Sequence, residues 1–343
     1  MESSSLSSPL PRVCVTGGGG FIASWLVKLL LSRGYAVHAT VRDPCDPKNA
    51  FLKQLDGAPE KLRLFKADML DYDTVAAAFA GCEGVFHVAT PVPERKLVDP
   101  EKEMMAPAIE GTRNVLKACS ATNVQKLIQV SSLGAVVLNL TWPQDKIKDE
   151  SCWSDREFCR ENKIWYVLAK IEAEEIALEY SKKTGLHIVR LCPSVVFGPL
   201  LQHVVPNTTS NALLYIIKGG PDTMNNKFWP LVDVRDVADA LLLLYNKAES
   251  SERYLCSLDQ LDLKNLLQIL KNMYPNYSYV DKMVDEDFRL EITSDKIKNL
   301  GWKPRKLEET LADSIESYKE AGILEVSKPC RLPFLFHVST ALE

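Results

Sequence analysis

Residues 13–31 read Val-Cys-Val-Thr-Gly-Gly-Gly-Gly-Phe-Ile-Ala-Ser-Trp-Leu-Val-Lys-Leu-Leu-Leu, and this stretch decides the fold. A short apolar run precedes four consecutive glycines, and apolar residues then recur at helical spacing, which predicts a strand, a tight turn and a helix. Glycine lets the backbone approach an anion closely, and the first turn of a helix offers unpaired N–H groups. A glycine-rich hairpin is the alternative, but the flanking strand and helix patterns favour a diphosphate site.

The glycines have the spacing of a dinucleotide-binding turn. The motif is Thr16-Gly17-x-x-Gly20-x-x-Ala23, and the usual fingerprint permits either glycine or alanine at its last position. Further strands and helices are then predicted in alternation, the strands at 36–41, 62–67, 84–88 and 126–131 and the helices at 74–79 and 109–119. Such alternation is typical of a parallel sheet covered by helices on both faces, so we expect an α/β, doubly wound fold.

Composition excludes several classes of protein. The 343 residues are 46% apolar and 25% charged, and the formal net charge is −4 without a dense basic run, which argues against a nucleic-acid partner. The nine cysteines are odd in number and scattered, as in a reducing compartment, and none has metal-ligand spacing. Without an export signal or a long apolar span, we expect a cytoplasmic protein that is a monomer or a weak dimer and binds neither metal nor membrane.

The end of the second predicted strand decides between NAD and NADP. An acidic residue there binds the ribose 2′-hydroxyl of NAD, whereas an arginine accommodates the 2′-phosphate of NADP. The chain has Arg42, then Asp43, and Lys48 a few residues later, so two cations favour NADP. A solvated charge cluster is the alternative. Asp68, after the third strand, is placed to meet the adenine amino group or to cap the next helix.

A second constellation lies between residues 130 and 171. Two serines, Ser131 and Ser132, end a predicted strand, and Tyr166 and Lys170 are four residues apart in a segment of helical composition. Reduction of a carbonyl needs a proton donor, and a tyrosine with a pKa near ~10 becomes a useful one when a neighbouring cation stabilises its anion. Ser132 would then hold the carbonyl oxygen by a hydrogen bond. Each motif is weak alone; together they favour a carbonyl reductase.

At these residues the chain resembles an extended short-chain dehydrogenase/reductase, specifically the plant branch of cinnamoyl-CoA reductases and dihydroflavonol 4-reductases. The resemblance runs from about Val13 to Leu324. It also rests on five further stretches: Ala-Thr-Val-Arg-Asp-Pro at 39–44, Gly-Val-Phe-His-Val-Ala-Thr-Pro at 84–91, Asp-Glu-Ser-Cys-Trp-Ser-Asp at 149–155, Cys-Pro-Ser-Val-Val-Phe-Gly-Pro at 192–199 and Val-Asp-Val-Arg-Asp-Val-Ala at 232–238.

The resemblance implies a Rossmann-type fold that binds NADP. The residues that it implies around the diphosphate are Gly17, Gly18, Gly19, Gly20, Phe21, Ile22 and Ala23. Those implied at the 2′-phosphate are Arg42 and Lys48, and those beside adenine are Asp68 and Met69. Val88, Ala89 and Thr90 would line the ribose and nicotinamide edge, and Pro193, Ser194, Val195 and Val196 would form the loop beneath the nicotinamide. Ser132, Tyr166 and Lys170 match the catalytic triad, the last two also contacting the cofactor; Ser131 is the alternative serine.

Two departures from the family pattern concern the substrate. Cinnamoyl-CoA reductases typically read Asn-Trp-Tyr-Cys-Tyr-Gly-Lys around the tyrosine, and this chain reads Ile-Trp-Tyr-Val-Leu-Ala-Lys at 164–170. The segment after Ser132, Leu-Gly-Ala-Val-Val-Leu-Asn at 133–139, lacks the early asparagine with which dihydroflavonol reductases select the flavonoid hydroxyl pattern. The resemblance therefore implies the branch, a cinnamoyl-CoA reductase-like enzyme, without fixing one substrate.

The second half of the chain is expected to supply the substrate pocket. We expect a flexible tail at 1–11, an NADP-binding domain at 12–198 to which 228–248 returns, a smaller C-terminal substrate lobe at 199–227 and 249–325, and a C-terminal tail at 326–343. His203 is a weak candidate for a substrate contact, because lone loop histidines are more often surface residues. A CoA substrate brings several phosphates, which would need cations near the cleft such as Lys218 or Arg253.

These features together predict an NADPH-dependent carbonyl reductase of plant phenylpropanoid metabolism. The favoured substrate is a hydroxycinnamoyl-CoA thioester, reduced to the aldehyde. A ketone or aldehyde of phenylpropanoid, flavonoid or polyketide type is the alternative. A non-catalytic NADP-binding regulatory scaffold is the alternative from another class, but a scaffold has no need of the proton donor that Tyr166 and Lys170 provide.

Overall fold

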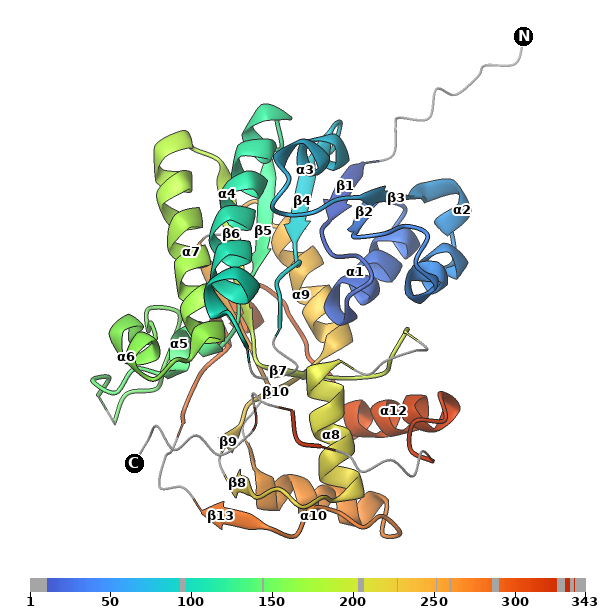
Figure 1. Ribbon diagram of the computed structural model, residues 1–343, viewed down its shortest axis with the longest axis vertical. Helices are drawn as coiled ribbons and strands as arrows, with labels where there is room; N and C mark the ends of the chain where they lie inside the picture. Colours follow the sequence, from blue (N-terminus) through green and yellow to red (C-terminus); the bar gives the residue numbers. More distant parts are fainter. Residues whose placement is uncertain are drawn as a thin grey trace.

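A seven-stranded parallel sheet organises the protein (Figure 1). The computed structural model describes residues 11–92, 97–143, 145–202, 207–226, 228–250, 252–258, 261–285, 290–325, 331–333 and 336. In spatial order the strands are β11 (Arg253–Cys256), β6 (His187–Pro193), β5 (Lys126–Val130), β4 (Gly84–His87), β1 (Arg12–Val15), β2 (Ala36–Val41) and β3 (Leu62–Lys66). The strand order reverses between β1 and β4, so their carboxyl ends open the crevice in which doubly wound folds bind ligands.

Helices cover both faces of the sheet, as the alternation predicts (Figure 1). One face packs against α1 (Phe21–Ser32) and α9 (Val234–Asn246), and the other against α3 (Tyr72–Phe79), α4 (Ala106–Ala121) and α7 (Trp165–Thr184). Along β1, Val13 and Val15 pack on the face that α1 and α9 cover. Cys14 packs on the opposite face, which is the period-two alternation of a strand. The prediction of an α/β, doubly wound Rossmann-type sheet is confirmed.

A second hydrophobic cluster lies beyond the carboxyl ends of the strands (Figure 1). Its helices are α8 (Thr208–Lys218), α10 (Leu263–Met273) and α12 (Leu307–Glu320). Three short strand pairs join this region: β7 (Val195–Phe197) with β10 (Leu231–Asp233), β8 (Met224–Asn226) with β13 (Met283–Asp285), and β9 (Phe228–Trp229) with β12 (Leu261–Asp262). The remaining short helices are α2 (Ala58–Lys61), α5 (Gly134–Val137), α6 (Arg156–Glu161) and α11 (Asp295–Asn299), with a 3₁₀ helix η1 (Pro47–Gln54) and a π-helical turn η2 (Glu101–Met105).

The predicted domain boundaries remain a prediction. Of the predicted tails, 1–10 and most of 326–343 lie outside the described residues. Where the C-terminal stretch is described, Leu332 is buried in the cluster around α8, α10 and α12. Phe336 stacks on Trp229 with ring centroids 5.0 Å apart. That part of the chain therefore packs against the protein.

Lys126 joins β5 to the end of α9 from inside the protein. Its side chain is buried, and its ammonium donates to the carbonyl oxygens of Leu244, Tyr245 and Lys247 and to the hydroxyl of Ser250. The last carbonyls of a helix have no partner within the helix, and a cation there also complements the helix dipole. Lys126 therefore fixes the carboxyl-terminal end of α9 on the sheet.

Lys126→Met should destabilise the fold, because methionine keeps the apolar stem and leaves those carbonyl oxygens without their donor. We expect a loss of roughly 2–3 kcal/mol in the free energy of unfolding, measured by urea denaturation. Lys117→Met, on the exposed side of α4, is the matched control and should change it by less than about 0.5 kcal/mol. Equal effects of the two substitutions would contradict this role for Lys126.

Candidate active site

The turn between β1 and α1 requires glycine at several positions. Gly17 has φ +69°, a conformation that L side chains rarely adopt, and Gly20 is the N-cap of α1 without a side-chain cap. A Cβ on Gly18 would lie 2.8 Å from the Cβ of Ala39, and one on Gly19 would lie 2.2 Å from Asn49 Oδ1. Only glycines therefore let this turn pack so closely against β2 and η1, and the turn leads into the amino-terminal end of α1, where unpaired N–H groups suit a dinucleotide diphosphate.

Thr16 ties this turn to the end of β4. Its hydroxyl accepts the backbone N–H groups of Val88 and Ala89, each at 3.0 Å, and lies 3.0 Å from His87 Nδ1. The segment predicted to line the ribose thus runs directly beside the glycine turn, and Ala89 Cβ is 3.1 Å from the position of a Cβ on Gly17.

The residues predicted at the adenosine end lie at the surface. Arg42 is exposed directly after β2, and Lys48 is exposed with its ammonium 2.8 Å from Asp46 Oδ2. Asp68 is exposed after β3, where Oδ1 accepts the N–H of Leu70. The N-cap of α3 is Asp71, so Asp68 does not cap that helix, and its predicted contact with adenine stays a prediction. Next to it, Met69 is half-buried against α4, where its carbonyl accepts the amide of Asn114.

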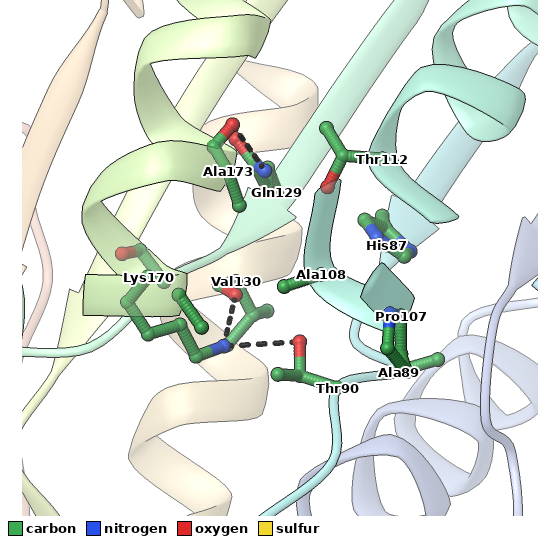
Figure 2. Close-up of a pocket in the computed structure, with 12 residues that line it drawn as sticks. His87, Ala89, Thr90, Pro107, Ala108, Thr112, Gln129, Val130, Lys170 and Ala173 are labelled. Atoms are coloured by element: carbon green, nitrogen blue, oxygen red, sulfur yellow. Dashed lines mark hydrogen bonds between the residues drawn. The ribbon is translucent and has the colours of Figure 1, made fainter. Parts of the chain in front are cut away.

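The second constellation comes together between β5 and α7. Tyr166 lies in the first turn of α7, and the hydroxyl of Ser132, just beyond β5, acts on its phenol by lowering the pKa of the phenol. Lys170, one turn later, donates to Thr90 Oγ1 and to the Val130 carbonyl, both at 3.1 Å (Figure 2). Thr90 therefore connects the ribose-lining segment with the lysine.

Of the two serines, Ser132 faces the tyrosine. Ser131 is buried and donates its hydroxyl to Glu174 at 2.5 Å, whereas Ser132 is half-buried and bonds with Tyr166. This arrangement supports Ser132 as the serine that holds a carbonyl oxygen.

Burial controls the protonation of the pair. It lowers the pKa of Lys170 to about 8, against the opposing effect of the negative charge on Glu174. Burial also raises the pKa of Tyr166, and the bond with Ser132 acts in the opposite direction. We expected a cation to lower the tyrosine pKa, but in this structure desolvation raises the pKa of Tyr166 and the opposing influence comes from Ser132. A protonated phenol at neutral pH is the form that donates a proton.

The loop predicted to lie beneath the nicotinamide follows β6. Pro193 accepts the N–H of Leu133 at 2.8 Å, which joins this loop to the turn that carries Ser132. The backbone N–H of Ser194 donates to the Cys256 carbonyl, and that of Val195 donates to the Pro230 carbonyl. Val196 is buried in the hydrophobic cluster that includes α1 and α9.

Gln202 makes a contact with the glycine turn that no sequence motif predicts. Its amide donates to the Gly19 carbonyl at 3.1 Å and to Ser24 Oγ at 3.2 Å. Beside it, the indole of Trp25 donates to the Pro199 carbonyl. The first residues after β7 are therefore fixed over the amino-terminal end of α1, next to the predicted diphosphate site. Only the three-dimensional contact reveals this, since glutamine in a loop carries no motif.

One expected substrate contact is wrong. Arg253 is 3% exposed and paired with Glu174, so it is not a cation at the mouth of a cleft for CoA phosphates. The expectation failed because an isolated arginine in the sequence gives no sign of a buried carboxylate partner. Lys218 is half-buried in the last turn of α8. His203 lies outside the described residues.

Comparisons with known proteins agree with this arrangement. A model of the NAD dependent epimerase/dehydratase family matches residues 13–256. The chain belongs to this family. It is 42% identical to cinnamoyl-CoA reductase 1 of Petunia hybrida over 92% of this chain and 94% of that protein. The prediction of an extended short-chain dehydrogenase/reductase of the cinnamoyl-CoA reductase branch is confirmed, and with it an NAD(P)-dependent oxidoreductase.

Solved structures of family members share the fold. Vestitone reductase from alfalfa (Medicago sativa L.) is 31% identical with a TM-score of 0.77, covering 91% of this chain and 99% of that one. Gre2 from Candida albicans, solved in complex with NADPH, is 26% identical with a TM-score of 0.79 and the same coverage.

Other classes of site find no support in the part of the chain that the structure describes. No described helix is both long and apolar enough to cross a membrane. The described ranges hold no group of three or more His, Cys, Asp or Glu side chains able to bind a metal ion. All eight described cysteines are free thiols.

Gly18→Ala should weaken NADPH binding about tenfold or more, because the new methyl group collides with Ala39 and displaces the turn. In the double variant Gly18→Ala/Ala39→Gly the space is restored, and we expect most of the affinity to return. The measurement is a titration with NADPH followed by quenching of tryptophan fluorescence. A double variant no better than the single one would show that crowding against β2 is not the cause.

Proposed function

We propose that the protein is an NADPH-dependent carbonyl reductase that reduces hydroxycinnamoyl-CoA thioesters to aldehydes. The observation that carries the proposal is that Ser132, Tyr166 and Lys170 come together at the ends of β4 and β5. Lys170 donates to Thr90, which ends the segment that Thr16 ties to the glycine turn. The similarity to Petunia cinnamoyl-CoA reductase 1 over nearly the whole chain supports the thioester substrate. We also propose that it acts in the cytoplasm, within plant secondary metabolism, as a monomer or weak dimer.

The protein's residues have separate tasks in this reaction. NADPH, when bound, supplies the hydride for the carbonyl carbon. Ser132 orients the carbonyl oxygen, and Tyr166 donates its phenolic proton to the oxygen as negative charge develops there. Hydride and proton together convert the thioester to a hemithioacetal. Its C–S bond then breaks while the hydroxyl proton passes to the sulfur, so that the aldehyde and the CoA thiol leave. Lys170 holds a positive charge near the tyrosine, with its ammonium 5.8 Å from the centre of the ring. Thr90 and the Val130 carbonyl fix that ammonium in place.

Preference for NADPH over NADH rests on the adenosine end of the site. Arg42 follows β2 and is exposed, so its guanidinium is accessible for a 2′-phosphate. Lys48 adds a second exposed cation, shared with Asp46. Asp43 is turned into its own loop, where Oδ1 accepts the N–H of Cys45, which removes the acidic competitor for a ribose hydroxyl.

A substrate panel tests the proposed function. NADPH consumption is measured with hydroxycinnamoyl-CoA esters, the matching free aldehydes and dihydroflavonols, and with NADH in place of NADPH as the cofactor control. We expect turnover of the thioesters with NADPH and a rate at least about tenfold lower with NADH, since one charge-assisted pairing is worth that much. Turnover confined to free aldehydes or ketones would instead support a reductase of the flavonoid or polyketide type.

Tyr166→Phe separates an enzyme from a scaffold. Phenylalanine keeps the ring and removes only the proton donor, so turnover should fall by about 10²–10⁴ while the dissociation constant of NADPH changes little. Turnover and cofactor titration on the same preparation provide the measurement, with wild-type protein as reference. A variant that retains full turnover would exclude Tyr166 as the donor, and one that retains the full biological effect without turnover would support the regulatory scaffold.

A further inference from the structure

Glu174 is a fully buried carboxylate for which the proposed reaction has no use. It follows Lys170 by four residues on α7, so the two side chains leave the same face of the helix. Its Oε1 accepts the hydroxyl of Ser131 at 2.5 Å, and its Oε2 lies 2.8 Å from Arg253 Nε. One carboxylate thus joins the catalytic helix to the end of β5 and to β11.

Arg253 connects Glu174 to the residues that follow Ser132. Its guanidinium donates to the carbonyl oxygens of Ala135 in α5 and of Cys152, at 3.1 and 2.6 Å, and it lies 3.9 Å from the centre of the Trp153 ring. Ser132 therefore stands between Ser131, which bonds to Glu174, and Ala135, which bonds to its partner Arg253. Both flanks of Ser132 are held by the same ion pair.

The charges around Glu174 do not cancel. Arg190 on β6 is also buried, with Nη1 4.0 Å from Glu174 Oε2, so one carboxylate faces two guanidinium groups and the ammonium of Lys170 lies one turn away. Loss of its negative charge would leave Arg190, Arg253 and Lys170 without the carboxylate that they share. Buried positive charges without a counter-charge lower the pKa of a neighbouring ammonium.

We propose that Glu174 is a positioning residue, which fixes Ser132 relative to Tyr166 and supplies the negative charge that keeps Lys170 protonated. This proposal rests on the proposed function, since it assigns Ser132, Tyr166 and Lys170 their roles. Glu174 touches neither substrate nor cofactor; it acts through Ser131, Arg253 and the electrostatic field at α7.

Few other groups near Lys170 change charge in the working pH range. From β4, His87 faces it, but burial and the lysine charge lower the pKa of His87 to about 3, so it is neutral. From β6, Cys192 faces it, and burial raises the pKa of that thiol to about 12. The arginines of β6 and β11 stay charged, which leaves Tyr166 on α7 as the group whose titration couples to that of Lys170.

Glu174→Gln tests the charge. Without the carboxylate the pKa of Lys170 falls, so the ammonium beside Tyr166 loses its proton at lower pH. We expect the alkaline limb of the kcat/KM profile for reduction to move about one pH unit towards acid. We also expect kcat to fall about tenfold with little change in KM for the substrate. The position of the limb does not depend on the fraction of folded protein, so partial unfolding does not mimic the shift.

Two further variants separate charge from position. Glu174→Asp keeps the charge with a shorter reach, so it should retain the wild-type alkaline limb and lose activity. Ser131→Ala removes one bond of Glu174 without changing charge, and should lower kcat severalfold with the limb unmoved. Glu179→Gln, exposed on the same helix, is the control and should match the wild type throughout. A normalised Glu174→Gln profile that superimposes on the wild type would overturn the proposal.

A second readout does not need turnover. The dissociation constant of NADPH, measured against pH by fluorescence, should rise as Lys170 loses its proton near pH 8, and this rise should begin about one pH unit lower in Glu174→Gln. If no carbonyl compound is reduced but this shift occurs, the proposed function fails and the role of Glu174 stands. If turnover is found but neither pH dependence shifts, the role of Glu174 is wrong and the function stands.

Discussion

The hydroxyl of Thr16 connects the two halves of the site. It is fully buried at the end of β1 and receives two backbone N–H groups from the segment after β4. Thr90, at the end of that segment, accepts a hydrogen bond from Lys170. Hydrogen bonds of Thr16 and Lys170, together with the short segment from Val88 to Thr90, thus link β1, β4, β5 and α7. The reversal of strand order at β1 and β4 makes this possible, because it places both carboxyl ends at one crevice.

Buried cations support the site by binding groups inside the protein rather than a ligand. Arg253 is the clearest case, since its guanidinium is consumed by a carboxylate and three backbone carbonyls. Lys126 does the same for the end of α9. Each cation donates hydrogen bonds to backbone carbonyl oxygens, and these bonds hold the segments around Ser132 and β5 in place.

The sequence predicted the parts of the fold that depend on local pattern. The strand at 36–41 and the helix after Gly20 were placed closely, because alternation and glycine chemistry are local signals. Strand β6 received no assignment, since Arg190 interrupts an apolar run and only its burial with Glu174 explains it. The pairing of Ser132 with Tyr166 followed from a motif. The contact of Gln202 with Gly19 and the burial of Arg253 depend on residues far apart in the chain, which no spacing encodes.

The altered tyrosine motif has a packing explanation. The three residues between Tyr166 and Lys170 that differ from the usual Cys-Tyr-Gly are Val167, Leu168 and Ala169, and all three are at most 7% exposed within one cluster. Val167 fills the space beside Gly134, where its Cγ2 would lie 3.1 Å from an added Cβ. Larger and smaller side chains are exchanged there within a core, a change that cores tolerate when total volume is kept. The substitutions therefore lie in the core where α7 packs on α5, between Tyr166 and Lys170 in the sequence.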